Sequence, residues 1–299
     1  MISIIVPCKN EQEAVSKFYT ELMKSLSTID DSYEIIFVDD GSTDSTKEEF
    51  IKVKKQDHNV KILSFSRNFG KEAAMLAGFN EAKGDYIVTM DVDLQDPPAL
   101  LKEMHDELQK GEYDCIGTRR ITRKGEPPIR SFFARCFYRL INKFIEVEIV
   151  DGARDYRMMT RQMMESVLSL TEYHRFSKGI FAWVGYKTKY LTYENIERVA
   201  GETKWSFFKL FKYAIEGIVS FTGAPLTASL VFGGLLSLFG FVYLIVTLCI
   251  GITTNSLIIA LVSLACGIQL ISIGILGEYV GRTFFQTKNR PIYIIKERI

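Results

Sequence analysis

Short apolar runs alternate with longer amphipathic segments along the first 120 residues of the chain. The apolar runs are rich in Ile and Val, which is typical of strands that are buried on both faces of a parallel sheet. The segments between them repeat their apolar residues at helical spacing. This alternation predicts βαβ units and an α/β fold with a mostly parallel sheet. The predicted strands are residues 2–7, 33–40, 60–66, 85–91 and 114–118, and the predicted helices are 11–26, 42–56, 71–82 and 97–110.

A different pattern follows, because no charged residue and no histidine occurs between Glu216 and Glu278. Residues 226–250 and 257–276 are two apolar runs within this stretch, and each is long enough to cross a hydrocarbon core as a helix. The link between them is short and uncharged, whereas basic residues flank both runs. This pattern predicts a membrane hairpin with both termini in the cytoplasm. A hairpin buried in the core of a soluble protein is the alternative.

Two segments before the hairpin combine basic residues with aromatic and aliphatic ones. Residues 129–147 place Arg130 and Arg135 at near-helical spacing opposite Phe and Ile, and residues 204–215 repeat this mixture. Such a face is typical of helices at a membrane surface, and packing against the protein's own core is the alternative. We therefore expect an integral membrane protein. Its expected parts are a cytoplasmic domain (1–215), two transmembrane helices within 216–280, and a cytoplasmic basic tail (281–299).

Composition narrows the class of protein further. The chain has 299 residues, of which 47% are hydrophobic and 24% charged, which excludes a disordered or low-complexity protein. The net charge is +1, which gives no support to a nucleic-acid binder. The five cysteines form no CxxC pair and show no metal-binding spacing with the three histidines, so we expect reduced thiols.

Polar residues gather where three of the predicted strands end, at residues 7–11, 39–44 and 91–98. In a parallel sheet, ligands bind beyond the carboxyl ends of the strands. The sequence contains neither GxGxxG after the first strand nor GxxxxGK[ST] anywhere. These motifs define dinucleotide oxidoreductases and P-loop NTPases, so their absence argues against both classes. Carboxylates stand in place of the glycines that would cradle a phosphate. A diphosphate could approach them only with a cation between, which implies Mg²⁺ or Mn²⁺.

Asp91 and Asp93 are the clearest candidates for binding this cation. In an extended chain they point to the same side, about 6.5 Å apart along the strand. This spacing suits one direct metal ligand, with the other acting through water or on the sugar nucleotide. Solvated strand ends carry such pairs too, but the strand-end position and the following Gln-Asp-Pro-Pro favour function. At Asp39 and Asp40 the alternative is a turn before the next helix. We expect Ser42 or Thr43 to cap this helix, which leaves both carboxylates free to bind a base or a ribose.

Four motifs together carry a family resemblance. IIVPCKNE, VDDGSTDST, RNFGKEAAMLAGF and MDVDLQDPP occur in this order. They resemble the inverting family-two nucleotide-sugar glycosyltransferases of the GT-A fold. The similarity is strongest to the polyprenyl-phosphate glycosyltransferases, which include bactoprenol glucosyltransferases and dolichyl-phosphate mannose synthases. The resemblance covers essentially the whole chain, since the bacterial members also carry a C-terminal pair of membrane helices, but the motifs do not identify the sugar.

The resemblance implies a role for each group of candidate residues. Asp91 and Asp93 are implied as metal ligands, and Asp93 and Asp155 as the catalytic carboxylates. Asp155 would either accept a proton or orient an arginine, and a structural ion pair with Arg154 or Arg157 is the alternative. The implied donor-binding residues are Pro7, Asn10, Glu11, Asp39, Asp40, Asp91, Gln95 and Arg119, and the acceptor-phosphate residues are Arg130, Arg135, Arg198 and Lys204.

These features predict a metal-dependent, inverting transferase. We expect its cytoplasmic catalytic domain to move one sugar from UDP-glucose or a UDP-N-acetylhexosamine to polyprenyl (undecaprenyl) phosphate at the cytoplasmic face of the bacterial cytoplasmic membrane. The Gln-x-x-Arg-Trp motif of processive synthases is absent, which favours a single transfer. The alternatives are a GDP-mannose-dependent enzyme, a diacylglycerol acceptor, and a catalytically silent membrane scaffold. We expect no nucleic-acid partner, and the sequence leaves open whether the chain forms a homo-oligomer.

Overall fold

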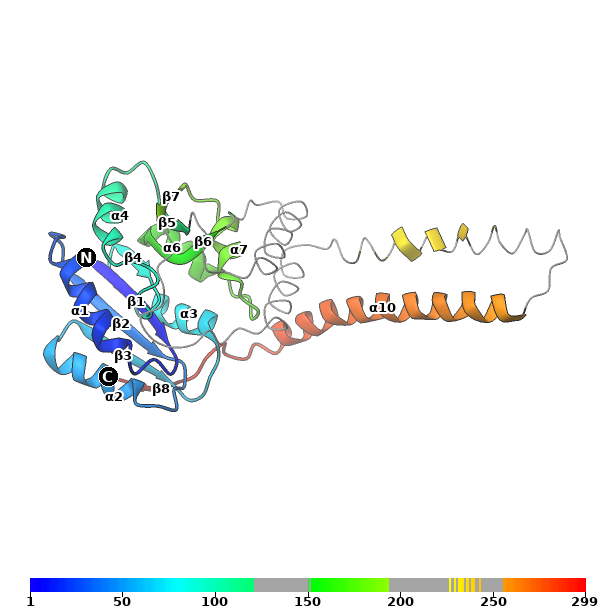
Figure 1. Cartoon of the computed structure of the whole chain (residues 1–299), viewed down its shortest axis with the longest axis horizontal. Helices are drawn as coiled ribbons and strands as arrows, with labels where there is room; N and C mark the ends of the chain where they lie inside the picture. Colours follow the sequence, from blue (N-terminus) through cyan, green and yellow to red (C-terminus); the bar gives the residue numbers. More distant parts are fainter. Residues whose placement is uncertain are drawn as a thin grey trace. The chain divides into compact units, whose positions relative to one another are not determined.

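The computed structural model describes residues 1–120, 150, 152–193 and 255–299, with a few positions between 226 and 242. The chain divides into two units (Figure 1). The first comprises Met1–Tyr213 and Pro291–Ile299, and the second comprises Ala214–Arg290. The described residues of the first unit form an α/β domain around an eight-stranded sheet.

Every strand and helix predicted over the first 120 residues is present in the predicted order. Most of their ends agree with the prediction to within one or two residues, although α1, α2 and α4 begin three or four residues later than expected. In chain order the elements are β1 (Ile2–Cys8), α1 (Val15–Leu26), β2 (Tyr33–Asp39), α2 (Thr46–Gln56), β3 (Val60–Phe65), α3 (Lys71–Glu81), β4 (Tyr86–Thr89), α4 (Leu100–Gln109) and β5 (Cys115–Arg120).

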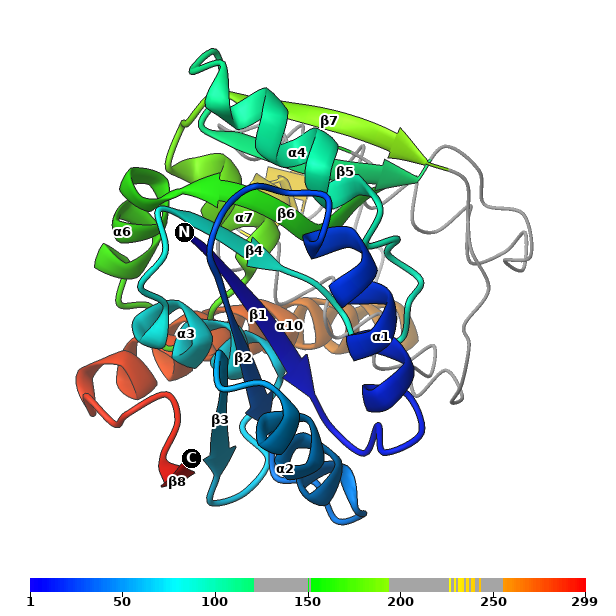
Figure 2. The same ribbon diagram turned by 90° about the vertical axis from the view of Figure 1, so that its left-hand side faces the viewer.

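Three more strands complete the sheet, whose order is β7-β5-β6-β4-β1-β2-β3-β8. Strands β4, β1, β2 and β3 are parallel neighbours, and β7 (Thr188–Tyr193) is parallel to β5. Strand β6 (Ala153–Thr160) lies between β4 and β5 and is antiparallel to both. β8 (Ile295–Arg298) is antiparallel to β3 at the other edge. The fifth predicted strand therefore does not pair with the fourth, as Figure 2 shows.

Helices cover both faces of this sheet. Side chains of α1, α2 and α4 form one continuous core with the inward-facing residues of β1 and β2. Phe37 on β2 stacks on Phe50 of α2, with ring centroids 4.5 Å apart. On the opposite face α3 approaches β1 so closely that a Cβ at Gly78 would overlap Ile5. Two shorter helices, α6 (Arg161–Ser169) and α7 (Ser177–Trp183), follow β6 in the chain and contact it.

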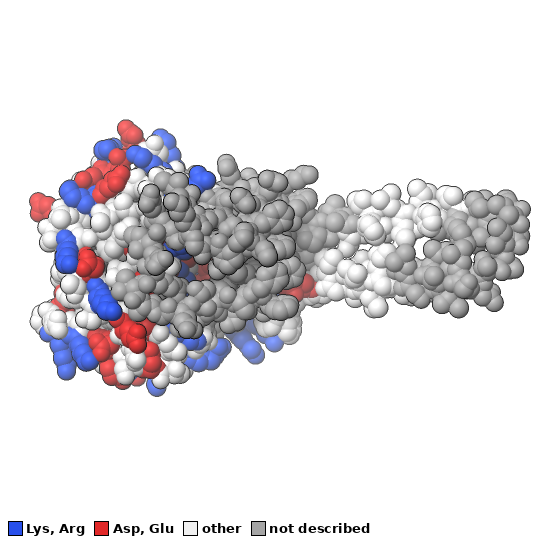
Figure 3. All heavy atoms as spheres, in the orientation of Figure 1, with Lys and Arg blue, Asp and Glu red and all other residues white. Residues whose placement is uncertain are grey.

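The strand β8 belongs to the first unit although it follows the second unit in the chain. Its neighbour Ile299 exchanges two backbone hydrogen bonds with Ile62, at 2.9 and 3.0 Å. Lys47 of α2 forms an ion pair with Glu297 at 2.6 Å. On the visible face of this unit, Lys and Arg are interspersed with Asp and Glu, so positive and negative charges balance locally (Figure 3).

The second unit contains α10 (Asn255–Thr287), which includes the predicted apolar run 257–276. Most of the run 226–250, and the segments 129–147 and 204–215, lie outside the described residues. Crossing a bilayer requires a helix that is both long and continuously apolar. Within the part of the chain that the structure describes, no helix meets both conditions. This finding contradicts the predicted location of the chain as an integral membrane protein.

Candidate active site

The loop that follows β1 is joined to the loop that follows β2. Pro7 is part of β1, and Asn10 and Glu11 lie directly beyond the strand. The Asn10 N–H donates to the Ser42 hydroxyl at 3.0 Å, and the Asn10 Oδ1 accepts from the Thr43 N–H at 2.8 Å. Asn10 has a φ of 55°, a left-handed conformation that asparagine tolerates better than most residues. Two motifs that are separate in sequence therefore form one rigid rim.

Helix α2 begins at Thr46 rather than at Ser42. The Ser42 hydroxyl is engaged by the loop after β1, so it does not cap the helix. Asp44 instead accepts from the Thr46 N–H at 3.1 Å and from its hydroxyl at 2.6 Å. The Thr46 hydroxyl in turn accepts from the Glu11 N–H at 2.8 Å. The expectation that Ser42 or Thr43 caps this helix is therefore wrong, because both residues lie before its first turn and bind Asn10.

Asp39 and Asp40 are buried at the carboxyl end of β2 and are bound by backbone amides. Asp39 accepts from the Ser42 N–H at 2.8 Å. Asp40 accepts from the Phe69 N–H at 2.6 Å and from the Gly70 N–H at 3.0 Å. Burial raises the pKa of Asp40, and the two amides oppose that rise. Gly70 has a φ of 99°, which only glycine adopts readily, and this conformation presents its N–H to Asp40 just before α3.

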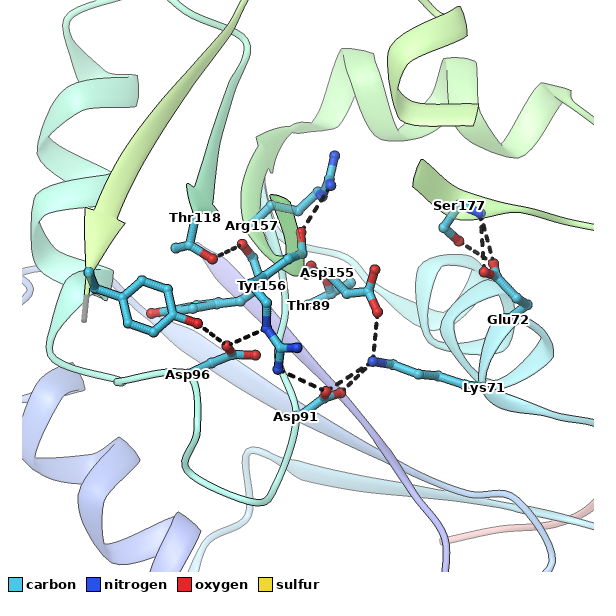
Figure 4. Close-up of polar contacts among 12 residues, drawn as sticks. Lys71, Glu72, Thr89, Asp91, Asp96, Thr118, Asp155, Tyr156, Arg157 and Ser177 are labelled. Atoms are coloured by element: carbon cyan, nitrogen blue, oxygen red, sulfur yellow. Dashed lines mark hydrogen bonds and ion pairs between the residues drawn. The ribbon is translucent and has the colours of Figure 1, made fainter. Parts of the chain in front are cut away.

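Asp91 lies beyond β4 and is bound by a lysine from another part of the chain. The Lys71 Nζ, at the start of α3, lies 2.7 Å from an Asp91 oxygen and 2.7 Å from an Asp155 oxygen. Figure 4 shows Lys71 reaching from α3 toward both carboxylates. Asp155 comes from β6, where its backbone carbonyl accepts from the Thr89 hydroxyl of β4 at 2.5 Å. The insertion of β6 beside β4 therefore brings Asp155 to the same edge of the sheet as Asp91.

The charges around Asp155 keep it ionised. Burial by itself would raise the pKa of this carboxyl, but the positive charges of Lys71, Lys178 and Arg154 outweigh burial and hold the pKa well below its usual range. A carboxylate with so low a pKa is a poor proton acceptor at neutral pH. The ion pair that Asp155 forms is with Lys71. Arg157, one of the arginines expected as its partner, instead places its guanidinium 3.8 Å over the ring of Phe181.

Arg154 forms a second ionic contact at the same edge. Its Nε lies 3.1 Å from Asp96, which is only 1% exposed, and its Nη2 lies 4.0 Å from Asp91. Asp96 also accepts from the Tyr193 hydroxyl at 2.5 Å. Burial, with the nearby charge of Asp96, raises the pKa of Tyr193 to about 12, so its hydroxyl remains a donor at neutral pH. These contacts anchor the loop after β4 to β6 and β7.

Asp93 and Gln95 lie within this loop. Asp93 is buried, and its Oδ1 accepts from the Gln95 N–H at 3.1 Å. The Gln95 Oε1 accepts from Arg120 at 3.2 Å. Arg119, the arginine implied by the resemblance, is exposed on β5. The predicted acceptor-phosphate residues Arg130, Arg135, Arg198 and Lys204 all lie outside the described residues.

Glu72 follows Lys71 in α3 but points away from the carboxylates, toward Ser177 at the start of α7 (Figure 4). It accepts from the Ser177 N–H at 3.1 Å and also from the Ser177 hydroxyl. Burial raises the pKa of Glu72 to about 7, and the hydrogen bonds from Ser177 oppose that rise. The first turn of α3 therefore has two contacts: Lys71 binds the carboxylates of the candidate site, and Glu72 binds the start of α7.

Sequence reasoning did not single out Lys71 or Arg154 as site residues. Both had a usable signal: Lys71 lies inside the motif RNFGKEAAMLAGF, and Arg154 immediately precedes Asp155. A basic residue that directly follows Gly70 at a predicted helix start, near the end of a strand, is well placed to face a site. What no local pattern indicates is the pairing itself, because Lys71 and Asp155 are 84 residues apart.

The acidic residues at this edge fit a divalent cation that is shared with a ligand. Among the described residues, no three His, Cys, Asp or Glu side chains form a metal-binding group by themselves. Asp91 and Asp93 offer hard oxygen donors. Mg²⁺ and similar ions are commonly bound by one or two carboxylates, with water and phosphate oxygens completing the shell. The contact of Asp91 with the Lys71 ammonium at 2.7 Å also marks a position that favours positive charge.

The fold and the carboxylate cluster beyond β1, β2 and β4 define a sugar-transferring enzyme, and comparisons with known proteins support this class. Residues 3–168 match the family model for glycosyl transferase family 2. A relative from Bacillus subtilis (strain 168), whose name gives only the class glycosyltransferase, is 43% identical over 99% of this chain and 92% of its own length. The prophage bactoprenol glucosyl transferase homolog of Escherichia coli (strain K12) is 38% identical, over 99% and 98%. The chain therefore belongs to glycosyl transferase family 2.

A solved structure supports the fold. The mannosyltransferase of Pyrobaculum calidifontis, in complex with GDP-Man and Mn²⁺, superposes with a TM-score of 0.50. The match covers 73% of this chain and 61% of that protein, at 18% identity. An identity this low shows the fold alone. The expected GT-A fold and the assignment as a transferase enzyme are confirmed.

Proposed function

We propose that this enzyme transfers a single sugar, glucose or an N-acetylhexosamine, from a UDP-linked donor to undecaprenyl phosphate or a similar polyprenyl phosphate. The observation that carries the proposal is the meeting of Asp91 from the β4 end and Asp155 from β6 around Lys71, beside the rim formed after β1 and β2. Bactoprenol glucosyl transferases related over their full length support glucose and the lipid acceptor.

The donor would lie against the rim. Residues there offer backbone and carboxylate groups for a nucleoside, and the expected contacts at Pro7, Asn10, Glu11, Asp39 and Asp40 remain our assignment, as do those at Gln95 and Arg119. Asp91 and Asp93 would hold Mg²⁺ or Mn²⁺, which neutralises the charge that develops on a leaving diphosphate. The relative solved with GDP-Man and Mn²⁺ shares the fold, which supports a divalent cation here.

The acceptor would enter from the side of Asp155. A phosphate monoester has a second pKa of about 6, so it is largely dianionic at neutral pH and needs no strong base. One of its oxygens attacks the anomeric carbon opposite the nucleotide, the bond to the diphosphate breaks, and the sugar is inverted. The low pKa of Asp155 fits a carboxylate that orients a cation rather than one that takes a proton. We assign Arg130, Arg135, Arg198 and Lys204 to the acceptor phosphate.

A donor panel tests this proposal. Purified enzyme in detergent is incubated with undecaprenyl phosphate, Mn²⁺ and radiolabelled UDP-glucose, UDP-N-acetylglucosamine or GDP-mannose. We expect organic-extractable label from a UDP-sugar, and none after EDTA treatment until Mg²⁺ or Mn²⁺ is restored. Asp93→Asn is the matched inactive control.

Each alternative gives a different result in the same panel. Label from GDP-mannose alone would replace the proposed donor class. Label with diacylglycerol but not with undecaprenyl phosphate would replace the acceptor, and full activity of a metal-stripped enzyme would remove the cation. No transfer with any donor or acceptor would overturn the proposal.

A further inference from the structure

Lys71 makes two strong contacts whose chemistry conflicts with donor binding. Its ammonium nitrogen lies 2.7 Å from an oxygen of Asp91 and 3.0 Å from the other oxygen of the same carboxylate. The same nitrogen lies 2.7 Å from Asp155. A divalent cation bound at Asp91 would use these carboxylate oxygens and would repel an ammonium at this distance. The Lys71–Asp91 contact therefore competes with direct metal binding by Asp91.

The contact with Asp155 has no such conflict. Asp155 lies on β6 and is not among the residues proposed to hold the metal, and its backbone is fixed to β4 through Thr89. An ammonium group carries three N–H donors on a flexible four-carbon stem. When Asp91 is taken by the donor complex, Lys71 retains Asp155 as a partner and gains free donors. Its side chain as a whole is 39% exposed.

We propose that Lys71 is an acceptor-phosphate ligand that becomes available when the donor complex displaces it from Asp91. The proposal deepens, and rests on, the function proposed above. Lys71 lies between Asp91, where the leaving diphosphate would be, and Asp155, on the side where the acceptor would enter. A phosphate dianion placed beside Asp155 without a cation between them would be repelled, and Lys71, the cation in direct contact with Asp155, can take that position.

An order of binding follows. In the donor-free enzyme, the cluster of Lys71 with Asp91 and Asp155 carries one negative charge in excess, which disfavours an incoming phosphate. Once Asp91 is engaged by the donor complex, Lys71 and Asp155 balance each other, and this excess negative charge no longer faces the acceptor. The acceptor is therefore expected to bind after the donor, and Lys71 is the residue that imposes this order.

The first test measures metal binding without nucleotide, so it does not depend on activity. Free Mn²⁺ is titrated into the protein and followed by electron paramagnetic resonance. Lys71→Met should bind Mn²⁺ several-fold more tightly than the wild type, because the competing ammonium is gone. Lys102→Met is the matched control: it removes a surface lysine on α4 that pairs with Asp106 at 2.9 Å. Equal Mn²⁺ affinity in Lys71→Met and the wild type would show that bound metal does not displace Lys71 from Asp91.

The second test measures acceptor binding and kinetics. Lys71→Met should raise the KM for undecaprenyl phosphate at least tenfold while leaving the KM for donor unchanged or lower. Lys71→Arg should recover part of the acceptor affinity, because it keeps the charge with a different geometry. Calorimetric binding of undecaprenyl phosphate to the wild type should be strengthened by UDP with Mn²⁺, and this strengthening should be lost in Lys71→Met.

The outcomes separate this inference from the proposed function. If the wild type transfers no sugar to any acceptor, the proposed function fails, and the Mn²⁺ titration still reports on the displacement. If the wild type is active but Lys71→Met keeps a normal acceptor KM, the inference about Lys71 is wrong and the function stands. Should Lys71→Met lose its cooperative thermal transition, Lys71→Gln, which keeps a polar terminus, replaces it in both tests.

Discussion

The two sides of the candidate site hold their carboxylates in different ways. On the rim after β1 and β2, Asp39 and Asp40 are bound by backbone amides, including those of Phe69 and Gly70. At the edge formed by β4 and β6, Asp91 and Asp155 are bound by the side chain of Lys71. Backbone amides cannot leave without refolding a loop, whereas an ammonium on a flexible stem can turn away. The first side is a fixed frame, and the second is a set of exchangeable ion pairs.

This difference predicts that substitutions on the two sides affect different properties, namely stability on one side and turnover on the other. Replacing a carboxylate in the fixed frame should alter stability first, because buried N–H groups lose their acceptor. Replacing a carboxylate among the exchangeable pairs should alter turnover first, because the group is partly exposed and its partner can find another. The predictions below compare the two sides, beginning with the largest expected effect.

Among the variants that compare the two sides, Asp91→Asn should give the largest loss of activity. The change removes the negative charge proposed to bind the metal and the leaving diphosphate, so kcat/KM for sugar transfer should fall by about 10²–10³-fold. Asp91 is 26% exposed and Lys71 keeps Asp155, so the thermal transition should shift little. Radiolabel transfer and a circular-dichroism melt measure the two quantities. If Asp91→Asn kept activity within threefold of the wild type, Asp91 would not be the proposed ligand of the metal and the diphosphate.

Asp40→Ala should have the largest effect on stability. It leaves the Phe69 and Gly70 N–H groups without their buried acceptor, which costs about 2–3 kcal/mol. Asp40→Asn keeps one acceptor oxygen and should cost roughly half as much. Urea titration followed by circular dichroism compares the two variants. An unchanged midpoint in Asp40→Ala would show that this side is not the fixed frame.

The sequence predicts the strand end that carries the fixed frame, but not the hydrogen bonds that hold it. Asp39 and Asp40 end a strand with a clear apolar pattern, from which free carboxylates are expected, whereas both are bound by backbone amides. The partner of Asp39, Ser42, is three residues away, but Gly70, which binds Asp40, is 30 residues away in the chain. Strand β6 was missed because Arg154 and Arg157 interrupt its apolar pattern, although both side chains are engaged once the sheet forms. Without β6, nothing in the sequence places Asp155 beside Lys71. Contacts between distant segments are set by the order of strands, which local periodicity does not encode.

Tyr193→Phe should have a smaller effect on stability than Asp40→Ala. It removes the hydrogen bond to Asp96, which keeps Arg154 as its partner, so the loss should be about 1 kcal/mol. Because burial raises the pKa of Tyr193 to about 12, the hydroxyl is protonated throughout pH 6–9, and the loss should be constant over that range. Urea midpoints at several pH values provide the measurement. A loss that grows steeply within this range would contradict the assignment.

Glu72→Gln should show an effect only as a pH dependence of stability, no larger than the loss in Tyr193→Phe. Burial raises the pKa of Glu72 in the folded protein to about 7, above its ordinary value of 4.5, so folding takes up a proton between these pH values. Wild-type stability should therefore fall as pH rises from about 4.5 to 7, whereas Gln cannot ionise. Allowing for solvent screening, the wild type should lose on the order of 1 kcal/mol relative to the variant. Parallel pH profiles of the two proteins would show that Glu72 titrates normally.

The position of β8 has a consequence for how the protein is made. Lys47 and Glu297, which form an ion pair beside this edge of the sheet, are 250 residues apart in the chain. At about 5–20 residues per second, a ribosome takes roughly 10–50 s to synthesise the residues between them. Throughout that interval the outer edge of β3 has no partner strand, and such an edge is a template for pairing with other nascent chains. The catalytic domain therefore matures only after the second unit has been translated, and premature termination within that unit leaves the edge open.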